Sequence, residues 1–157
     1  MPPRKRHVAI LIPFRHTNRG VFVFLQKRAT DAKRLPGYFG FWGGGIESGE
    51  TPEEALQREM REELGLNLGV LRYEFFRRYE FPASVKYVSL MPVDDTFEPN
   101  ITILEGDSGK FFDERAVMKE RKLIQEDKQV LRDVFHRLTR AEMSSTSSQR
   151  SRLRHAA

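Results

Sequence analysis

The sequence contains no cysteine. This excludes disulfides, thiolate metal sites and cysteine nucleophiles, and it fits a cytoplasmic protein. Long apolar runs are also missing, since no stretch approaches the roughly 18 apolar residues that a membrane helix needs. The basic residues 1–6 are followed only by the strand-length apolar run 8–12, which argues against a signal peptide.

The chain has 157 residues, of which 39% are hydrophobic, enough for one domain with a sizeable core. Its net charge of +5 comes from the two ends. Residues 1–6 and 144–157 hold six basic and no acidic residues, and 21 basic and 22 acidic residues remain between them. Two interpretations stay open for these ends: solvated, frayed segments, or tails that make weak contact with nucleic-acid phosphates.

Composition predicts three regions. Residues 1–6 form a basic extension, residues 7–143 form the folded domain, and residues 144–157 form a serine-rich tail that we expect to be disordered. Apolar patterning predicts strands at 8–12, 21–26, 70–76 and 85–93, shorter ones at 101–104 and 110–112, and helices at 52–64 and 126–143. Strands flanked by a middle and a terminal helix indicate an α/β fold with a mixed sheet between helical layers.

The middle helix has clear end signals. Thr51 suits the N-cap, Pro52 the first helical position, and Glu54 completes a capping box. Gly65 suits the C-terminal stop. The buried stripe of this helix is predicted to consist of Leu56, Met60 and Leu64.

The opposite side of the same helix carries Glu59, Glu62 and Glu63. Residues three and four apart share a helical face, so we expect these carboxylates to converge and to repel one another unless cations offset them. Arg58 and Arg61 could provide those cations on an ordinary solvated surface.

The wider spacing favours a functional interpretation. Gly44 is followed by five residues and Glu50, then by seven residues and the run Arg-Glu-Met-Arg-Glu-Glu-Leu-Gly-Leu at 58–66. This pattern resembles the Nudix box, Gly-x5-Glu-x7-Arg-Glu-U-x-Glu-Glu-x-Gly-U with U aliphatic, at every specified position. The resemblance implies a Nudix-like α/β/α sandwich and a hydrolase that splits a diphosphate linked to a nucleoside.

The resemblance also implies a metal site. Mg²⁺, for which Mn²⁺ can substitute, prefers oxygen ligands and bridges phosphate oxygens. In the family pattern Glu59, Glu62 and Glu63 are metal ligands and the carbonyl of Gly43 is a further one. Glu59 additionally helps to deprotonate the attacking water.

Two further roles follow from the resemblance. Glu50 and Arg58 form a structural ion pair that orients the helix. A carboxylate outside the box, in a loop before a strand with paired aromatics, completes the metal site, which makes Glu105 the candidate and Asp107 its competitor. Glycine-flanked turn acids are also common without a metal.

The substrate contacts are less specified. Arg28, at the end of the second strand, occupies a common family position for phosphate contact, although a surface arginine is an equal alternative. Tyr38, Phe39, Phe41 and Trp42 could stack on a base, whereas such aromatics are more often core residues. Gly44, the first residue of the box, is a further candidate for substrate contact. Trp42 and Gly45 stand where many relatives have proline and a lysine or histidine.

The sequence favours a diphosphatase acting on nucleoside triphosphates or modified nucleotides. An ADP-ribose or nucleotide-sugar pyrophosphatase is the alternative, because Pro82 lies sixteen residues after Leu66, a spacing seen in the ADP-ribose branch. A Nudix-fold module that binds nucleotide or RNA without catalysis is a further alternative, against which the retained glutamates argue. We expect a small nucleotide as partner and no membrane, while a homodimer stays open.

Overall fold

The computed structural model describes residues 2–155, and the side chains of residues 2–141. Its strands are β1 (Arg6–Thr17), β2 (Gly20–Lys27), β3 (Phe39–Gly40), β4 (Trp42–Gly45), β5 (Glu74–Glu80), β6 (Ser84–Pro92) and β7 (Ser108–Phe112). Its helices are α1 (Pro52–Leu64), the 3₁₀ turn η1 (Leu68–Val70), α2 (Phe97–Asn100), α3 (Glu114–Lys119) and α4 (Gln125–His155).

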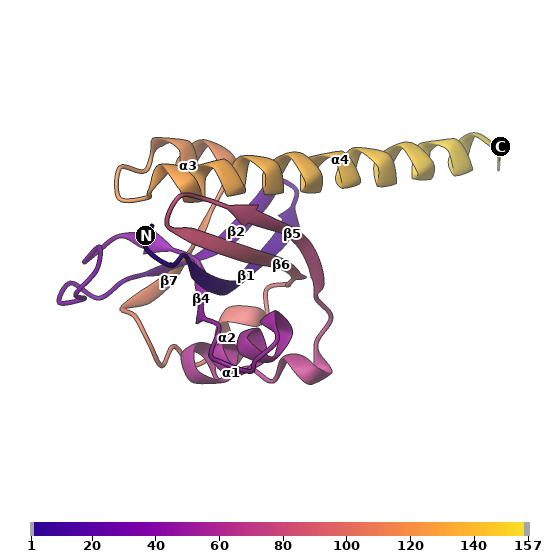
Figure 1. The fold of residues 1–157 in the computed structure, drawn as a ribbon. Coiled ribbons are helices and arrows are strands. Elements are labelled where there is room, and N and C mark those ends of the chain that lie inside the picture. The colour runs from indigo at the N-terminus through magenta and orange to yellow at the C-terminus, as the bar shows by residue number, and fades with distance from the viewer. Residues whose placement is uncertain (1, 156–157) are drawn as a thin grey trace.

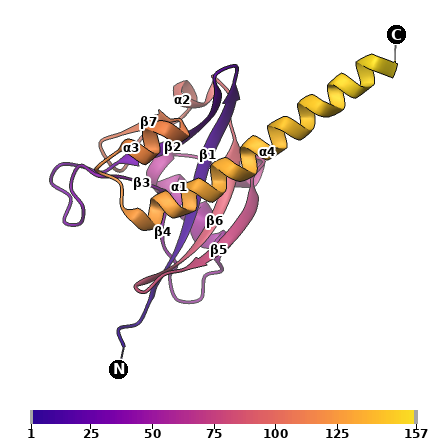
Figure 2. The same cartoon turned by 90° about the horizontal axis from the view of Figure 1, so that it is seen from above.

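All seven strands join one mixed sheet with the order β3-β2-β1-β6-β5, in which β4 also pairs with β1 and β7 with β2. Strands β1 and β6 run parallel, while the other pairs are antiparallel. Helices α3 and α4 lie on one face of this sheet and α1 and α2 on the other (Figures 1 and 2). This arrangement confirms the predicted α/β class with helices on both sides.

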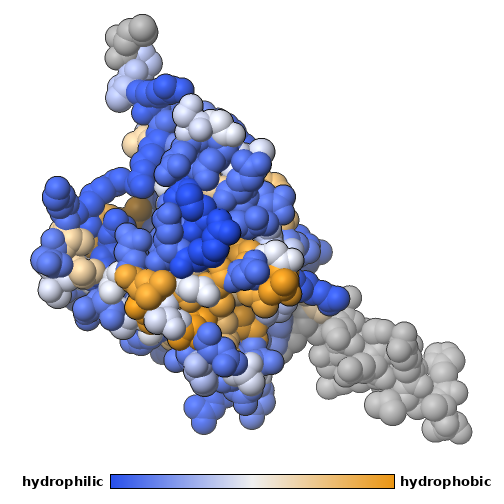
Figure 3. All heavy atoms as spheres, turned by 90° about the horizontal axis from the view of Figure 1, so that it is seen from below, coloured by the Kyte–Doolittle hydropathy of each residue, from blue (hydrophilic) through white to orange (hydrophobic). Residues whose placement is uncertain are grey.

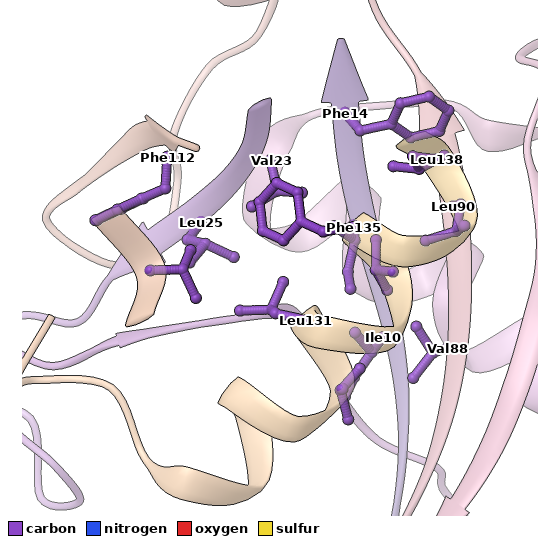
Figure 4. Close-up of a cluster of buried hydrophobic side chains, with 14 of the residues drawn as sticks. Ile10, Phe14, Val23, Leu25, Val88, Leu90, Phe112, Leu131, Phe135 and Leu138 are labelled. Carbon is purple, nitrogen blue, oxygen red and sulfur yellow. The ribbon is translucent and has the colours of Figure 1, made fainter. Parts of the chain in front are cut away.

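Two cores flank the sheet because β1 is buried on both faces. Ile10 and Ile12 of β1 belong to the core under α4, whereas Ala9 and Leu11 belong to the core over α1. This is the alternation expected of a strand. Figure 4 shows side chains of the α4 core, in which the helix residues Leu131, Phe135 and Leu138 face the strands.

The predicted ends of α1 are confirmed. The Thr51 hydroxyl accepts from the Glu54 amide, and the Glu54 carboxylate accepts from the Thr51 amide, which is the capping box. Gly65 adopts the left-handed conformation with φ 63° that ends the helix. The stripe Leu56, Met60 and Leu64 is buried.

Three predicted elements differ in the structure. The strand expected at 70–76 begins only at Glu74, because the Asn67 side chain caps the 3₁₀ turn η1 by accepting from the Gly69 amide. No strand forms at 101–104, where the Thr102 amide donates to the end of α1. Helix α4 continues through residues 144–155, where composition predicts disorder. The sequence has no glycine or proline after Gly109 to stop it.

Among the described residues, no helix combines the length and the apolar character needed to cross a membrane. Apolar side chains do gather on the face around α1, seen from below in Figure 3. The large hydrophobic residues exposed in the described part are Val70, Leu71, Phe75 and Leu104.

Candidate active site

A cleft of about 770 Å³ lies where the glycine-rich strand β4 meets the loop after β2 and the first turn of α4. One part of its lining is a cluster of carboxylates from α1 and from the loop before β7. Another part consists of cations from the loop after β2. Phe39 and Phe41 supply aromatic surface in the same cleft. The cleft therefore brings together both charge signs and an apolar wall.

Three carboxylates converge at one end of the cleft. Oxygens of Glu59, Glu63 and Glu105 all lie within 4.8 Å of one another. Glu59 and Glu63 are four residues apart on α1, so they share a face of the helix. Glu105 arrives from a separate loop, 42 residues after Glu63 in the sequence. Such a group can hold a hard divalent cation through oxygen ligands.

Backbone hydrogen bonds place Glu105 against the helix. The Leu104 amide donates to the Glu63 carbonyl at 2.8 Å, and the Asp107 amide donates to the Lys27 carbonyl at 2.9 Å. The buried Gln26 side chain donates to the Glu105 carbonyl at 3.0 Å. The loop is thus fixed on both sides of Glu105, while Asp107 lies outside the carboxylate cluster.

Glu63 is the buried member of the carboxylate cluster, with 3% of its surface exposed. The Gly43 amide donates to its Oε2 at 3.1 Å. Burial raises the pKa of Glu63 to about 9, and the neighbouring Glu59 and Glu105 carboxylates add to this shift. Three acids this close are unfavourable together as anions. The donor set therefore fits a bound divalent cation, which would compensate their charge.

Arg58 connects the carboxylate cluster to the loop that precedes α1. Its Nε and Nη2 donate to the two oxygens of Glu50, each at 2.9 Å, and Nη2 also donates to the Gly45 carbonyl at 3.0 Å. Its Nη1 donates to Glu59 Oε1 at 3.0 Å. The Arg58 hydrogen bond lowers the pKa of Glu50, and Glu50 in turn raises the pKa of Arg58. The structure contains the Glu50–Arg58 pair expected from the sequence.

Two glycines provide the space that these side chains need. A Cβ at position 44 would lie 2.5 Å from Glu59 Oε1, so only glycine there leaves the carboxylate in place. Gly43 has φ 127°, and a Cβ there would meet the Ala9 carbonyl oxygen of the paired strand β1. Both positions also line the cleft.

Some predicted residues lie elsewhere. Glu62 does not join the carboxylate cluster. Its side chain is 55% exposed and accepts from Arg58 Nη1 at 3.3 Å. Trp42 is fully buried and stacks on Phe24 with ring centroids 5.6 Å apart, so it cannot serve as a platform for a base. It alternates with Gly43 along β4 and therefore points into the core over α1. Tyr38 is not among the residues that line the cleft.

The predicted Arg28 does line the cleft, and its Nε donates to the Arg34 carbonyl at 3.0 Å. Lys33 and Arg34 extend the same cationic rim, although no pattern in the sequence marked them. A polar-turn loop with several basic residues is too common a feature to single out.

A buried ion pair also escaped the sequence analysis. Lys86 of β6 donates to Asp127 of α4 at 2.7 Å, and both line the cleft with side chains about one-tenth exposed. Burial raises the pKa of Asp127, which Lys86 opposes. The one available signal was a lysine inside an otherwise apolar strand, since such residues are seldom buried without a partner.

Comparison with known proteins identifies this architecture. Residues 3–137 match the family model of the NUDIX domain. The chain therefore belongs to the NUDIX family.

Relatives and solved structures agree with this assignment. The chain is 51% identical over 53 residues to the nucleoside triphosphatase NudI of Enterobacter sp. (strain 638). That match covers 34% of this chain and 37% of NudI, so the chain aligns with little more than a third of this curated relative.

The fold is similar to that of a mutT/nudix family protein from Listeria innocua, with a TM-score of 0.71, 16% identity, and coverage of 90% of this chain and 98% of the other. It is also similar to the NUDIX domain of Shewanella oneidensis NrtR complexed with ADP ribose, with a TM-score of 0.67, 16% identity, and coverage of 87% and 90%. At these identities the two structures support the fold alone.

Proposed function

We propose that this protein is a Mg²⁺-dependent hydrolase that cleaves the diphosphate linkage of nucleoside triphosphates or modified nucleotides. The main evidence for this function is the convergence of Glu59, Glu63 and Glu105 at one end of a cleft whose rim is cationic. A nucleoside triphosphate needs both features, since its phosphates carry dense negative charge and its hydrolysis is slow without charge compensation. The local match to the nucleoside triphosphatase NudI supports this substrate class.

Glu59, Glu63 and Glu105 would hold the metal. When bound, Mg²⁺ neutralises the phosphate charge and lowers the pKa of water in contact with it. The chain's own residues do the rest. Arg58 fixes Glu59 through Oε1, which leaves Oε2 to accept a proton from the attacking water.

Arg28, Lys33 and Arg34 bind the phosphates that face away from the carboxylates. Their guanidinium and ammonium groups lie on the rim of the cleft, where they neutralise charge without competing for the metal. Phe39 and Phe41 offer their ring faces to the base, because both line the cleft and are only partly buried.

A substrate panel with Mg²⁺ tests the proposal. Nucleoside triphosphates, ADP-ribose and nucleotide sugars are incubated with the protein, and the products are separated by ion-exchange chromatography. We expect turnover of triphosphates and its loss in Glu59→Gln, whereas Glu98→Gln on the exposed helix α2 removes the same charge and keeps turnover.

Other outcomes reassign the function. Turnover of ADP-ribose or a nucleotide sugar without turnover of triphosphates would transfer the assignment to that class. Tight nucleotide binding with no product from any compound would indicate a binding module.

A further inference from the structure

A second hollow, the β5–α4 groove, lies apart from the cleft. It has a volume of about 440 Å³, and Phe76 and Arg77 of β5 form one wall. The other wall belongs to α4 and consists of Asp133, His136, Arg137, Arg140 and Ala141. None of these residues lines the catalytic cleft, so the groove is a separate site.

The groove is cationic because its three arginines, Arg77, Arg137 and Arg140, outnumber its one acid. Asp133 Oδ2 accepts from the Tyr79 hydroxyl at 2.7 Å and from Arg77 Nη1 at 3.1 Å. Arg137 reaches Glu74 only at 3.8 Å, where the side chains are 57% and 67% exposed, so this pair is weak. Arg140 makes no ion pair among the described residues. The groove therefore presents an excess of arginine.

Two of these arginines are held in an accessible position. The Arg77 guanidinium lies 4.9 Å from the centre of the Phe76 ring, and that of Arg137 lies 6.0 Å from it. The ring belongs partly to the core under α4, so it gives both guanidinium groups a fixed apolar support. Their side chains stay 53% and 57% exposed, so the N–H groups that do not contact Asp133 or Glu74 are accessible to an anionic partner.

The positive charge continues along the sequence of α4. Residues 132–155 contain six arginines and two acidic residues. The helix itself projects beyond the edge of the sheet (Figures 1 and 2). Three arginines in the groove, with further arginines after them in the sequence, match a polymer of regularly spaced negative charges rather than a single small anion.

We propose that the β5–α4 groove binds the phosphate backbone of a nucleic-acid strand. A lipid surface is the other polyanion of suitable size, and it would need apolar side chains beside the cations to insert between acyl chains. Within the described residues α4 exposes no large hydrophobic side chain. Phe75 of β5 is exposed, but it lines a different hollow together with residues of α1. The large apolar side chain of the groove, Phe76, is packed against the core and not exposed for insertion into a membrane, which favours nucleic acid.

A nucleic-acid strand bound in this groove would leave the catalytic cleft open. Gln125 lines the cleft at the start of α4, and Arg137 follows twelve residues later, about 18 Å along the helix at 1.5 Å per residue. The groove can therefore hold a strand while a small nucleotide occupies the cleft. The inference does not depend on the proposed hydrolase activity.

The test measures binding of the full chain to a fluorescein-labelled single-stranded oligonucleotide of 20 nucleotides by fluorescence anisotropy at 50 and 200 mM salt. Arg137→Gln/Arg140→Gln removes two cations from the groove. The matched control Arg115→Gln/Arg121→Gln removes two exposed cations that do not line it. Thermal unfolding monitored by circular dichroism verifies that both variants fold.

We expect the groove variant to bind at least about 10-fold more weakly at 50 mM salt and to lower the slope of log K against log salt by about 2, one per lost phosphate contact. The control should bind within about 2-fold of the unchanged protein. Equal weakening by both variants would show that only net charge matters, and the proposal would be wrong. It would also fail if Arg137→Gln/Arg140→Gln abolished sedimentation with phosphatidylserine vesicles but left oligonucleotide binding intact.

Discussion

Gly44→Ala should slow turnover by about 10²-fold while leaving the fold intact. The added methyl group would lie 2.5 Å from Glu59 Oε1 and 2.6 Å from its carboxyl carbon, whereas ordinary contacts begin at 3.4 Å. The Glu59 carboxylate must therefore move by about 1 Å. A displacement of this size at a reacting group typically costs about 10²-fold in rate. That factor corresponds to about 2.7 kcal/mol of transition-state stabilisation.

Stability should change little, because the methyl group meets the flexible end of a side chain and not the backbone. Gly44 does not have a positive φ, so alanine adopts its backbone conformation without strain. We expect the melting temperature to stay within about 3 °C of the unchanged protein, since alanine also reduces the entropy of the unfolded chain.

The neighbouring glycine supplies the control. A Cβ at position 45 would have Arg6 as its nearest neighbour, at 3.9 Å, so Gly45→Ala adds the same atom without touching Glu59. Steady-state kinetics on the best triphosphate and a melting curve for each variant complete the assay. Equal turnover by Gly44→Ala and Gly45→Ala would refute the assigned role of Glu59. Loss of the folded state in Gly44→Ala would refute the claim that the clash is absorbed by a side chain.

Four further predictions concern the same site and the chain end. Glu63→Gln should lower turnover at least about 10²-fold but keep or raise the melting temperature, because burial already disfavours the charged carboxylate; near-normal turnover would exclude this residue from the site. Excess chelator should abolish turnover and Mg²⁺ or Mn²⁺ should restore it, so full activity in chelator would contradict a metal mechanism. Glu105→Gln should impair kcat more than Asp107→Asn does, and the reverse order would reassign the loop ligand. Truncation after Met143 should preserve folding and turnover of a mononucleotide, since the last residue of α4 in the described core is Leu138; a collapse of turnover would give the end of the chain a role in the cleft.

Much of the site was determined locally by the sequence. The ends of α1 follow from Thr51, Pro52 and Gly65, whose effects act within one turn of the helix. The ion pair between Glu50 and Arg58 was likewise predictable, because it joins the helix to the loop directly before it. Spacing along the chain becomes spacing in space wherever the backbone between two residues is a regular helix or a short turn.

Tertiary structure alone decided the remaining features. Glu59 and Glu62 are neighbours on one helix, yet Glu59 turns to the cleft and Glu62 to solvent, because the surrounding strands and loops cover only one side of α1. Glu105 reaches the site through hydrogen bonds between its loop and the end of α1. Lys86 and Asp127, 41 residues apart, meet because α4 packs across the sheet. Such contacts between residues distant in sequence depend on how helices and strands pack. No local pattern in the sequence encodes which of two similar side chains faces the cleft.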